Sequence, residues 1–427
     1  EEINEEWISD KTRYACDGLK NQRLDTPYIK KKNKFEKISW KEAYNKIFEK
    51  ISETPSEKIA ALTGDMTNME TMFALKEFFE KTIRSENLDS RVDDLYVNTS
   101  ERENYLLNSS IEGIEDSDLI ILIGANPRFE ATMLNSRIRK AYLNNHTDIF
   151  CLGDIGDLNY PYEVLDNSTK TIKDILNHTH RISEKIHNSK KPIFLIGQSA
   201  LKLKSSPFLF EELKKYLIKN NKINDNWNAL NILSNDASTV GSNYLNIFSS
   251  NDGTNKTIDK ISNNQIDVLF LFGQENLKIN KKNEFIIYVG SHGDKGANLA
   301  DIILPGAAYT EQDGYFANIE GKIQKAYKAS YPPGDAKEDW EIINELSQLL
   351  KRKKLFKNKD ELIDSMFNYL KLHPKDNKDY VENVFVSEKI NISEIDYYYS
   401  NVIARASKTM ADCRNEKIKF KKTGTEG

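Results

Sequence analysis

The 427-residue sequence is poor in cysteine, and this shortage limits the metal chemistry that the chain can support. Its three cysteines, Cys16, Cys151 and Cys413, are far apart, and no C-x-x-C pair is present. Paired, closely spaced thiolates are what a structural zinc ion or an iron-sulfur cluster requires. We therefore expect no metal centre held by this chain alone. So few thiols are also typical of a protein from a reducing compartment.

Long apolar runs and an excess of one charge are missing as well. No stretch approaches the roughly 20 apolar residues that cross a bilayer, and the mean hydropathy is −0.62. Lys and Arg number 61 against 65 Asp and Glu, which gives a net charge of −4. Such a balance provides no general attraction to nucleic acid or anionic lipid, so we expect neither nucleic-acid binding nor a direct membrane span. The first residue is Glu1 and no targeting segment is recognisable, which we interpret as a processed or truncated product.

Short apolar runs that end in glycine are the main structural signal. A run of this kind is typical of a parallel strand buried on both faces, after which glycine lets the backbone turn sharply. A seventh run, at 230–233, ends in Ser-Asn-Asp instead. The six glycine-ended runs lie at 59–64, 119–124, 149–153, 193–197, 268–273 and 286–290.

Amphipathic helices are predicted between these runs. Ser39 and Glu42 have the spacing of a capping box before a helix over 39–52, and Thr67 and Glu70 repeat that spacing. One apolar stripe predicts a helix over 171–187, and Pro207 opens another. Strands alternating with helices predict an α/β fold with doubly wound, mostly parallel sheets in two subdomains. The expected parts are a docking segment at 1–38, subdomains at 39–190 and 191–335, and a mainly helical cap and tail at 336–427.

Two stretches have the form of ligand-facing loops. At 300–324, the apolar run 302–304 stops at Pro305, and Asp313-Gly314 then supplies a turn that tolerates positive φ. At 124–131, Gly124 follows a strand, and Asn126-Pro127 stand directly before a helix, where free backbone N–H groups can hold an anion. A plain strand-to-helix connection explains the second stretch equally well.

Other polar residues have weaker claims to chemistry. Asp154 and Asp157 are close enough to be paired carboxylates, although turns and caps explain them better. His292 follows a strand end and could face the same cleft as Glu311 and Glu320, but a hydrogen-bonding loop histidine is the default interpretation. Buried carboxylates without partners would cost several kcal/mol, so Glu311 and Glu320 should cap the backbone or bind Lys or Arg across the domain junction.

The sequences of several stretches resemble those of a known family. Residues 300–324, "ADIILPGAAYTEQDGYFANIEGKIQ", resemble the closing motif of the molybdopterin oxidoreductase superfamily. With "NEEWISDKTRYACDGLKNQRL" at 4–24 and "GANPRFEATMLNSRIRKA" at 124–141, they resemble one branch of it, the large iron-sulfur subunit of respiratory NADH:quinone oxidoreductase, complex I. The stretches "PPGDAKEDW" at 332–340 and "ARASKTMADC" at 404–413 extend the likeness.

This resemblance implies a division of labour. In that family an amino-terminal half carries the iron-sulfur clusters, and the carboxyl-terminal half keeps a molybdopterin-enzyme fold without the metal. The chain looks like the second half alone: a non-catalytic scaffold in the peripheral arm that carries electrons from NADH to ubiquinone. The 2Fe-2S and 4Fe-4S clusters are expected in the missing half or partner chains, and FMN in another subunit. The implied location is the matrix side of the mitochondrial inner membrane or the cytoplasmic face of a bacterial inner membrane.

The resemblance also suggests site residues. No catalytic or metal-binding residue is expected, and the remains of a cofactor cleft would be marked by Gly124, Asn126, Pro127, His292, Glu311, Asn318 and Glu320. The segment at 7–24 mixes Trp, Tyr, Arg and Lys, residues suited to an interface. Its candidates for docking on the cluster-bearing half are Trp7, Asp10, Arg13, Lys20 and Arg23.

Two rival functions remain. A molybdenum or tungsten oxidoreductase resembling formate dehydrogenase would keep the fold and the closing motif. Against it, no Cys or Ser stands in a Cys-His-Gly-Pro type of setting. A dinucleotide-binding module would explain the strand-glycine runs but not the outer motifs.

Overall fold

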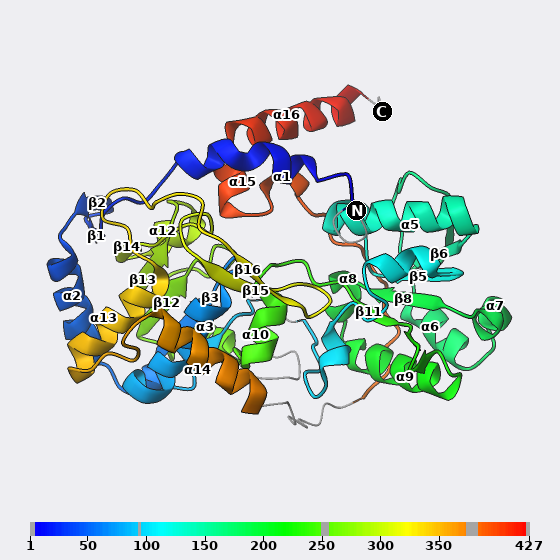
Figure 1. Cartoon of the computed structure of the whole chain (residues 1–427), viewed down its shortest axis with the longest axis horizontal. Helices are drawn as coiled ribbons and strands as arrows, with labels where there is room; N and C mark the ends of the chain where they lie inside the picture. Colours follow the sequence, from blue (N-terminus) through cyan, green and yellow to red (C-terminus); the bar gives the residue numbers. More distant parts are fainter. Residues whose placement is uncertain (1–4, 93–94, 249–255, 373–382, 424–427) are drawn as a thin grey trace.

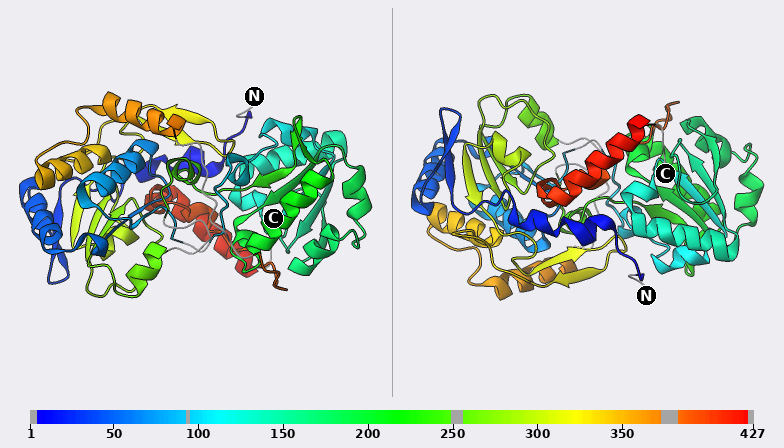
Figure 2. Two further views of the ribbon diagram at one scale, coloured as in Figure 1. Left: turned by 90° about the horizontal axis from the view of Figure 1, so that it is seen from below. Right: turned by 90° about the horizontal axis from the view of Figure 1, so that it is seen from above.

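The computed structural model describes residues 5–92, 95–248, 256–372 and 383–423. Parts of the expected docking segment (1–4) and of the expected tail (373–382, 424–427) lie outside the described residues. Two α/β lobes stand side by side, and the two terminal segments lie over the region between them (Figures 1 and 2).

The larger lobe is built on a seven-stranded sheet of order β2-β1-β14-β13-β12-β3-β4. The five strands from β14 to β4 run parallel, while β1 pairs antiparallel with both β14 and β2. Every glycine-ended run of this lobe is a strand, so the sequence prediction is confirmed here. The strands are β1 Tyr28–Lys31, β2 Lys34–Lys37, β3 Ile59–Thr63, β4 Leu88–Asp89, β12 Val268–Phe272, β13 Phe285–Gly290 and β14 Ile302–Pro305.

The smaller lobe is built on a five-stranded, wholly parallel sheet of order β11-β8-β5-β6-β7. Its strands are β5 Leu119–Ile123, β6 Asp148–Leu152, β7 Glu163–Asp166, β8 Pro192–Ile196 and β11 Leu230–Ile232. The expected boundary at residue 190 runs through this sheet, between β7 and β8. Apolar runs reveal strands but not their partners, and the chain leaves the larger sheet after β4 to return only at β12.

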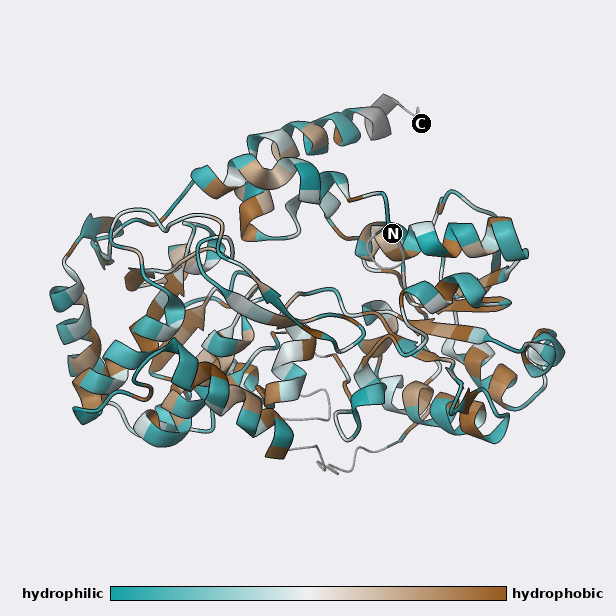
Figure 3. Ribbon diagram, viewed as in Figure 1, coloured by the Kyte–Doolittle hydropathy of each residue, from teal (hydrophilic) through white to brown (hydrophobic). Residues whose placement is uncertain are grey.

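Helices cover both faces of each sheet, and this explains the uninterrupted apolar runs. In β3, Ile59 and Ala61 belong to the core on one face, whereas Ala60 and Leu62 belong to the core on the other. Residues of β5 divide in the same way between the two cores of the smaller lobe. The residues coloured as hydrophobic are accordingly concentrated in the sheets (Figure 3).

The helices of the larger lobe are α2 Trp40–Glu53, α3 Met69–Phe78, α10 Thr239–Leu245, α11 Lys256–Ser262, α12 Lys295–Leu299, α13 Asp339–Lys351 and α14 Lys359–Leu372. The capping box of Ser39 and Glu42 is confirmed at α2. The one predicted for Thr67 and Glu70 is wrong, because Asn68 caps α3 by accepting from the backbone N–H of Thr71. The hydroxyl of Thr67 instead bonds the Gly64 and Phe272 backbones.

The helices of the smaller lobe are α4 Pro127–Glu130, α5 Thr132–Asn145, α6 Thr169–Leu176, α7 Ser183–Asn188, α8 Gln198–Leu201 and α9 Ser206–Lys219. The single helix predicted over 171–187 is wrong in extent. The chain ends α6 at Leu176 and passes through His178, whose φ of 59° is incompatible with a continuous right-handed helix. The apolar pattern continues across the break between the helices because α6 and α7 pack on the same core.

Short elements complete the fold. Two hairpins are formed by β9 Ile223–Asn224 with β10 Trp227–Asn228, and by β15 Gly314–Ala317 with β16 Ile323–Ala326. The terminal segments contribute α1 Asp10–Tyr14, α15 Val402–Ala406 and α16 Lys408–Thr423. The turn expected at Asp313-Gly314 is displaced: Gly314 begins β15, and the positive φ, 83°, belongs to Gly321 at the hairpin tip. No helix among the described residues is long and apolar enough to cross a membrane.

Candidate functional site between the lobes

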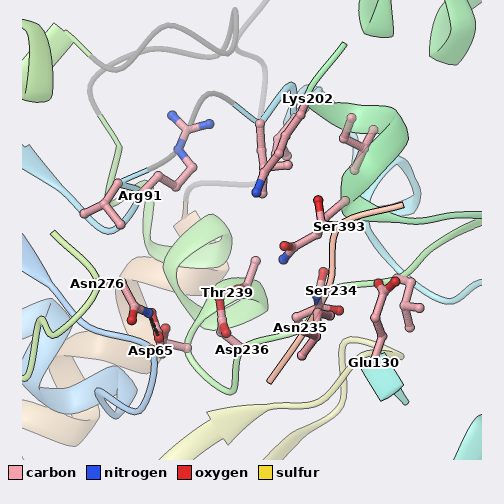
Figure 4. Close-up of a pocket in the computed structure, with 18 of the residues that line it drawn as sticks. Asp65, Arg91, Glu130, Lys202, Ser234, Asn235, Asp236, Thr239, Asn276 and Ser393 are labelled. Atoms are coloured by element: carbon pink, nitrogen blue, oxygen red, sulfur yellow. Dashed lines mark hydrogen bonds between the residues drawn. The ribbon is translucent and has the colours of Figure 1, made fainter. Parts of the chain in front are cut away.

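A cavity of about 520 Å³ lies between the two lobes (Figure 4). Its walls include residues two or three positions after strand ends: Asp65 after β3, Gln198 after β8, Ser234 after β11 and Glu275 after β12. Ligands of open α/β sheets bind beyond the carboxyl ends of the strands, so the cavity occupies the expected place. The terminal segments add to the lining with Lys11 and with residues 393–396, 399 and 400.

The charges around this cavity nearly cancel. Among the described lining residues, six are acidic and five are basic. Burial lowers the pKa of the Lys11 ammonium, and the charge of Asp236 opposes that effect. A lining so balanced gives little preference for the phosphates of a dinucleotide. The acidic residues are Asp65, Glu130, Asp236, Glu275, Glu394 and Asp396, and the basic ones are Lys11, Arg91, Lys202, Lys278 and Lys295.

The loop after β5 uses its own groups to satisfy its backbone. Gly124 has a φ of 59°, and a Cβ built on it would stand 2.5 Å from the backbone nitrogen of Ala200. The N–H of Asn126 donates to a carboxylate oxygen of Glu130 at 2.7 Å, and Pro127 occupies the first turn of α4. The side chain of Glu130 thus occupies the Asn126 N–H that a bound anion would need. Burial raises the pKa of Glu130 to about 7, against weaker opposing effects from the Asn126 N–H, Asn235 and Lys202.

His292 and Glu311 do not line the cavity but hold the amino-terminal segment. The ring of His292 is fully buried, with Nε2 2.9 Å from the carbonyl oxygen of Gly18 and Nδ1 2.8 Å from the hydroxyl of Ser291. Burial lowers its pKa, so the neutral ring is favoured. Glu311 receives both ends of the Arg23 guanidinium, at 2.5 and 2.6 Å. The default interpretation of His292 and the expected partner of Glu311 are both confirmed.

Asn318 and Glu320 lie at the tip of the β15–β16 hairpin, which reaches the smaller lobe. A carboxylate oxygen of Glu320 accepts the backbone N–H of Ile111 at 2.6 Å. Asn318 accepts the backbone N–H groups of Glu320 and Lys322 at 3.0 and 2.9 Å. Glu320 is therefore a contact between lobes, as expected, and its partner is a backbone amide rather than Lys or Arg.

Asp154 and Asp157 are turn residues. Asp154 accepts the N–H of Gly156 at 3.2 Å, and Asp157 accepts that of Asn159 at 2.8 Å. Asp157 also pairs with the guanidinium of Arg128 at 2.6 Å. These contacts confirm the structural interpretation over an acid-base one.

The exposed residues of the amino-terminal segment form a surface on the outside of the molecule. Trp7 is 67% exposed, Ile8 47% and Tyr14 50%, and Asp10, Arg13 and Lys20 are exposed beside them. Arg23 differs from these residues: its side chain is only 10% exposed, because it forms a buried ion pair with Glu311. The prediction that Arg23 is an interface residue is therefore wrong, because Arg23 is an internal anchor. No sequence pattern revealed its pairing with Glu311.

The described residues do not offer a ligand set for a metal. No group of three or more His, Cys, Asp and Glu side chains among them is arranged to hold an ion. None of the three cysteines lines the cavity. Burial raises the pKa of Cys151 to about 12, so its thiol stays protonated, and the sulfur donates to the carbonyl oxygen of Gly153. The described residues thus offer no metal site built from protein ligands alone.

Three family models match the sequence. The model described as "Molybdopterin oxidoreductase" matches residues 23–349. The chain belongs to the molybdopterin oxidoreductase family. Within this family, the two ends match narrower models. Residues 1–17 match "NADH-ubiquinone oxidoreductase NDSU1/NuoG-like, 4Fe-4S domain", and residues 382–413 match the model of a C-terminal region from the same group of NADH-ubiquinone oxidoreductase subunits.

Similar family members come from mitochondria and bacteria. The "NADH-ubiquinone oxidoreductase 75 kDa subunit" of Reclinomonas americana is 37% identical over 97% of this chain and 63% of its own length. An NADH-quinone oxidoreductase subunit of Rickettsia bellii is 37% identical over 99% of this chain and 62% of its own. The "NADH-ubiquinone oxidoreductase 78 kDa subunit, mitochondrial" of Candida albicans is 35% identical over 99% of this chain and 61% of its own. The chain thus spans less than two thirds of the length of these relatives.

Solved structures support the fold of the family. "Acetylene Hydratase from Pelobacter acetylenicus" matches with a TM-score of 0.54 at 14% identity, over 82% of this chain and 65% of that one. The formyltransferase/hydrolase complex of Methylorubrum extorquens matches with a TM-score of 0.52 at 10% identity, over 77% of this chain and 99% of that one. The α/β class with mostly parallel sheets is confirmed.

Proposed function

We propose that this chain is the scaffold portion of the large iron-sulfur subunit of NADH:ubiquinone oxidoreductase, and that it has no active site of its own. The observation that carries the proposal is the match, over nearly the whole chain, to proteins named as subunits of this enzyme. The charge balance of the cavity supports the second part, since six acidic and five basic lining residues give little attraction to the phosphates of a pterin dinucleotide. A dehydrogenase of the formate type is therefore not favoured, and no reaction step is assigned to the cavity.

The scaffold would meet its partner at the amino-terminal surface of Trp7, Ile8, Asp10, Tyr14, Arg13 and Lys20. Residues 1–17 match a 4Fe-4S domain model, so cluster-bearing polypeptide is expected next to this surface. Exposed aromatic and Arg side chains are the residues that contribute most at protein interfaces. We infer that the amino-terminal half of the subunit docks here and that other peripheral-arm subunits surround the rest.

Buried ion pairs would make this scaffold stiff. Arg23 binds Glu311 in the larger lobe, while Glu5 binds Arg137 of α5 in the smaller lobe at 2.9 Å, with both side chains at most 4% exposed. Lys140 joins Glu5 at 2.6 Å. A partner docked on Trp7 would thus be held in fixed register with both lobes.

Every redox centre would be held outside this chain. The 2Fe-2S and 4Fe-4S clusters would belong to the amino-terminal half of the subunit or to neighbouring chains, and FMN to another subunit. The chain would work in the peripheral arm, on the matrix side of the mitochondrial inner membrane or on the cytoplasmic side of a bacterial one.

Elemental and pterin analysis of the purified native assembly tests the scaffold role. Iron without molybdenum, tungsten or oxidised pterin, in particles that oxidise NADH, is the expected result. Stoichiometric molybdenum or tungsten with pterin would overturn it and make the cavity walls an active site.

A paired substitution tests the docking surface. Trp7→Ala with Arg13→Ala should lower the recovery of the assembled subunit by about tenfold or more, because Trp and Arg are enriched among interface hot spots, whose truncation costs about 2 kcal/mol or more. The matched control, Leu143→Ala with Arg139→Ala on the exposed face of α5, should assemble normally. Equal recovery of both variants would remove this surface from the proposal.

A further inference from the structure

A second aromatic surface lies on the larger lobe, apart from the amino-terminal segment. We call it the tyrosine ledge; it consists of Tyr309, Tyr327, Lys328 and Tyr331. Tyr331 is 84% exposed, Tyr327 74% and Tyr309 43%. The chain that carries the last two tyrosines runs from β16 along the upper edge of the larger lobe towards α13 (Figure 1, yellow). Large exposed apolar groups gathered in one place mark interaction sites more often than chance allows.

The ledge is held in place although its side chains are exposed. The backbone N–H groups of Ala329 and Ser330 both donate to the carbonyl oxygen of Thr310, at 2.8 and 3.0 Å. The N–H of Lys328 donates to Asp313 at 2.7 Å. The tyrosines are thus presented on a fixed backbone, which lowers the conformational entropy lost when a partner binds.

The chain segment that carries Tyr327, Lys328 and Tyr331 is cationic. Residues 321–331 contain three lysines and neither Asp nor Glu. The neighbouring carboxylate of Asp313 is already used by Lys325 at 3.0 Å and by the backbone N–H of Lys328 at 2.7 Å. Within the described part of the chain, Lys322 and Lys328 have no ion-pair partner. The ammonium of Lys328 lies 4.5 Å from the centre of the Tyr331 ring.

We propose that the tyrosine ledge is a docking surface for an acidic face of another protein. Tyrosine rings supply contact area with little entropy to lose, and their hydroxyl groups donate to carboxylates. Lys328 supplies complementary charge within the ledge, and Lys322 adds charge on the same segment, before β16. The ledge lacks the Leu, Ile and Phe side chains that insert into lipid, and the chain has a net charge of −4, so neither a membrane nor nucleic acid suits it as well.

The inference shares with the proposed function only the premise that the chain works in an assembly. The two can be separated in one experiment, because the docking surface and the ledge carry different aromatic residues. Oxidative footprinting would compare the native assembly with the isolated chain. Protection of Trp7 and Tyr14 reports on the proposed function, and protection of Tyr327 and Tyr331 reports on the ledge.

The expected result is that Tyr327 and Tyr331 are labelled at least about tenfold more slowly in the assembly. A zero-length carbodiimide, which joins lysine to carboxylate, should link Lys322 or Lys328 to an Asp or Glu of another polypeptide. Unchanged labelling of both tyrosines, or cross-links confined to this chain, would overturn the inference.

Variants supply an independent test. Tyr327→Ser, Tyr331→Ser and Lys328→Glu together should weaken binding of the partner identified by cross-linking about tenfold or more, with unchanged folding by circular dichroism. Ile218→Ser with Lys219→Glu, on the exposed end of α9, is the matched control and should bind normally. Undiminished binding by the triple variant, or binding of the isolated chain to anionic phospholipid vesicles that this variant abolishes, would refute an acidic protein partner.

Discussion

The Arg23–Glu311 pair fixes the amino-terminal segment to the larger lobe, and its removal should free that segment. The side chains of Arg23 and Glu311 are 10% and 4% exposed, and two hydrogen bonds of 2.5 and 2.6 Å join them. Replacing Arg23 by Met leaves Glu311 as a buried carboxylate with the Ala308 N–H, at 2.9 Å, as its remaining described donor. Loss of one partner from such a pair costs about 3–5 kcal/mol.

Hydrogen exchange is the appropriate assay because the effect is local. The amides of Leu24 and Gly293 bond across this junction, to Ser291 and Gln22, at 3.0 and 2.8 Å. If Arg23→Met destabilises the closed segment by about 3–5 kcal/mol, these amides should exchange roughly 10²- to 10⁴-fold faster.

Two further variants make this prediction refutable. Lys37→Met removes the exposed Lys37–Asp25 pair of the same region, where side chains are 65% and 43% exposed, and should cost less than about 1 kcal/mol. Arg23→Met with Glu311→Gln should lose less than the sum of the single changes, because no buried charge remains. Exchange equally slow in Arg23→Met and Lys37→Met would show that the pair does not anchor the segment.

Two other predictions concern the loop after β5. Gly124→Ala should destabilise the protein by more than about 2 kcal/mol in chemical denaturation, because the methyl group meets the Ala200 backbone at 2.5 Å and φ is 59°. Gly156→Ala, where φ is 73° and the space is open, should cost only about 1 kcal/mol; equal losses would contradict the packing argument. Glu130 has a pKa raised from 4.5 to about 7 by burial, so the folded protein holds a proton that the unfolded chain releases. Its contribution to stability should therefore fall as pH rises from about 4.5 to 7, by up to about 3 kcal/mol. Glu130→Gln should abolish that fall, and an unchanged pH profile would refute the assignment.

The strands were readable from the sequence because burial on both faces leaves an unbroken apolar run. Ile59 to Thr63 and Val268 to Phe272 could be recognised separately, but their pairing could not. The local sequence of neither strand indicates that the chain returns to the same sheet after 204 intervening residues. The expected boundary at residue 190 failed for this reason.

Tertiary partners also decided what the polar residues do. The need of Glu311 for a cation followed from its burial, whereas the choice of Arg23 depended on a contact between segments 288 residues apart. Asn68 replaced Thr67 as the cap of α3 because the Thr67 hydroxyl is bound to the ends of two strands. Local spacing alone could not rank these competing bonds.

The return of the chain to the larger sheet also determines the order in which the two sheets can form during synthesis on the ribosome. The smaller sheet is complete once residue 232 has been made, since all its strands lie between 119 and 232. β3 must wait for β12, which begins 205 residues after β3 ends. At about 5–20 residues per second, this delay is roughly 10–40 s. During that time an apolar strand has an unpaired edge, so the nascent larger lobe, rather than the finished protein, is where aggregation and chaperone binding should concentrate.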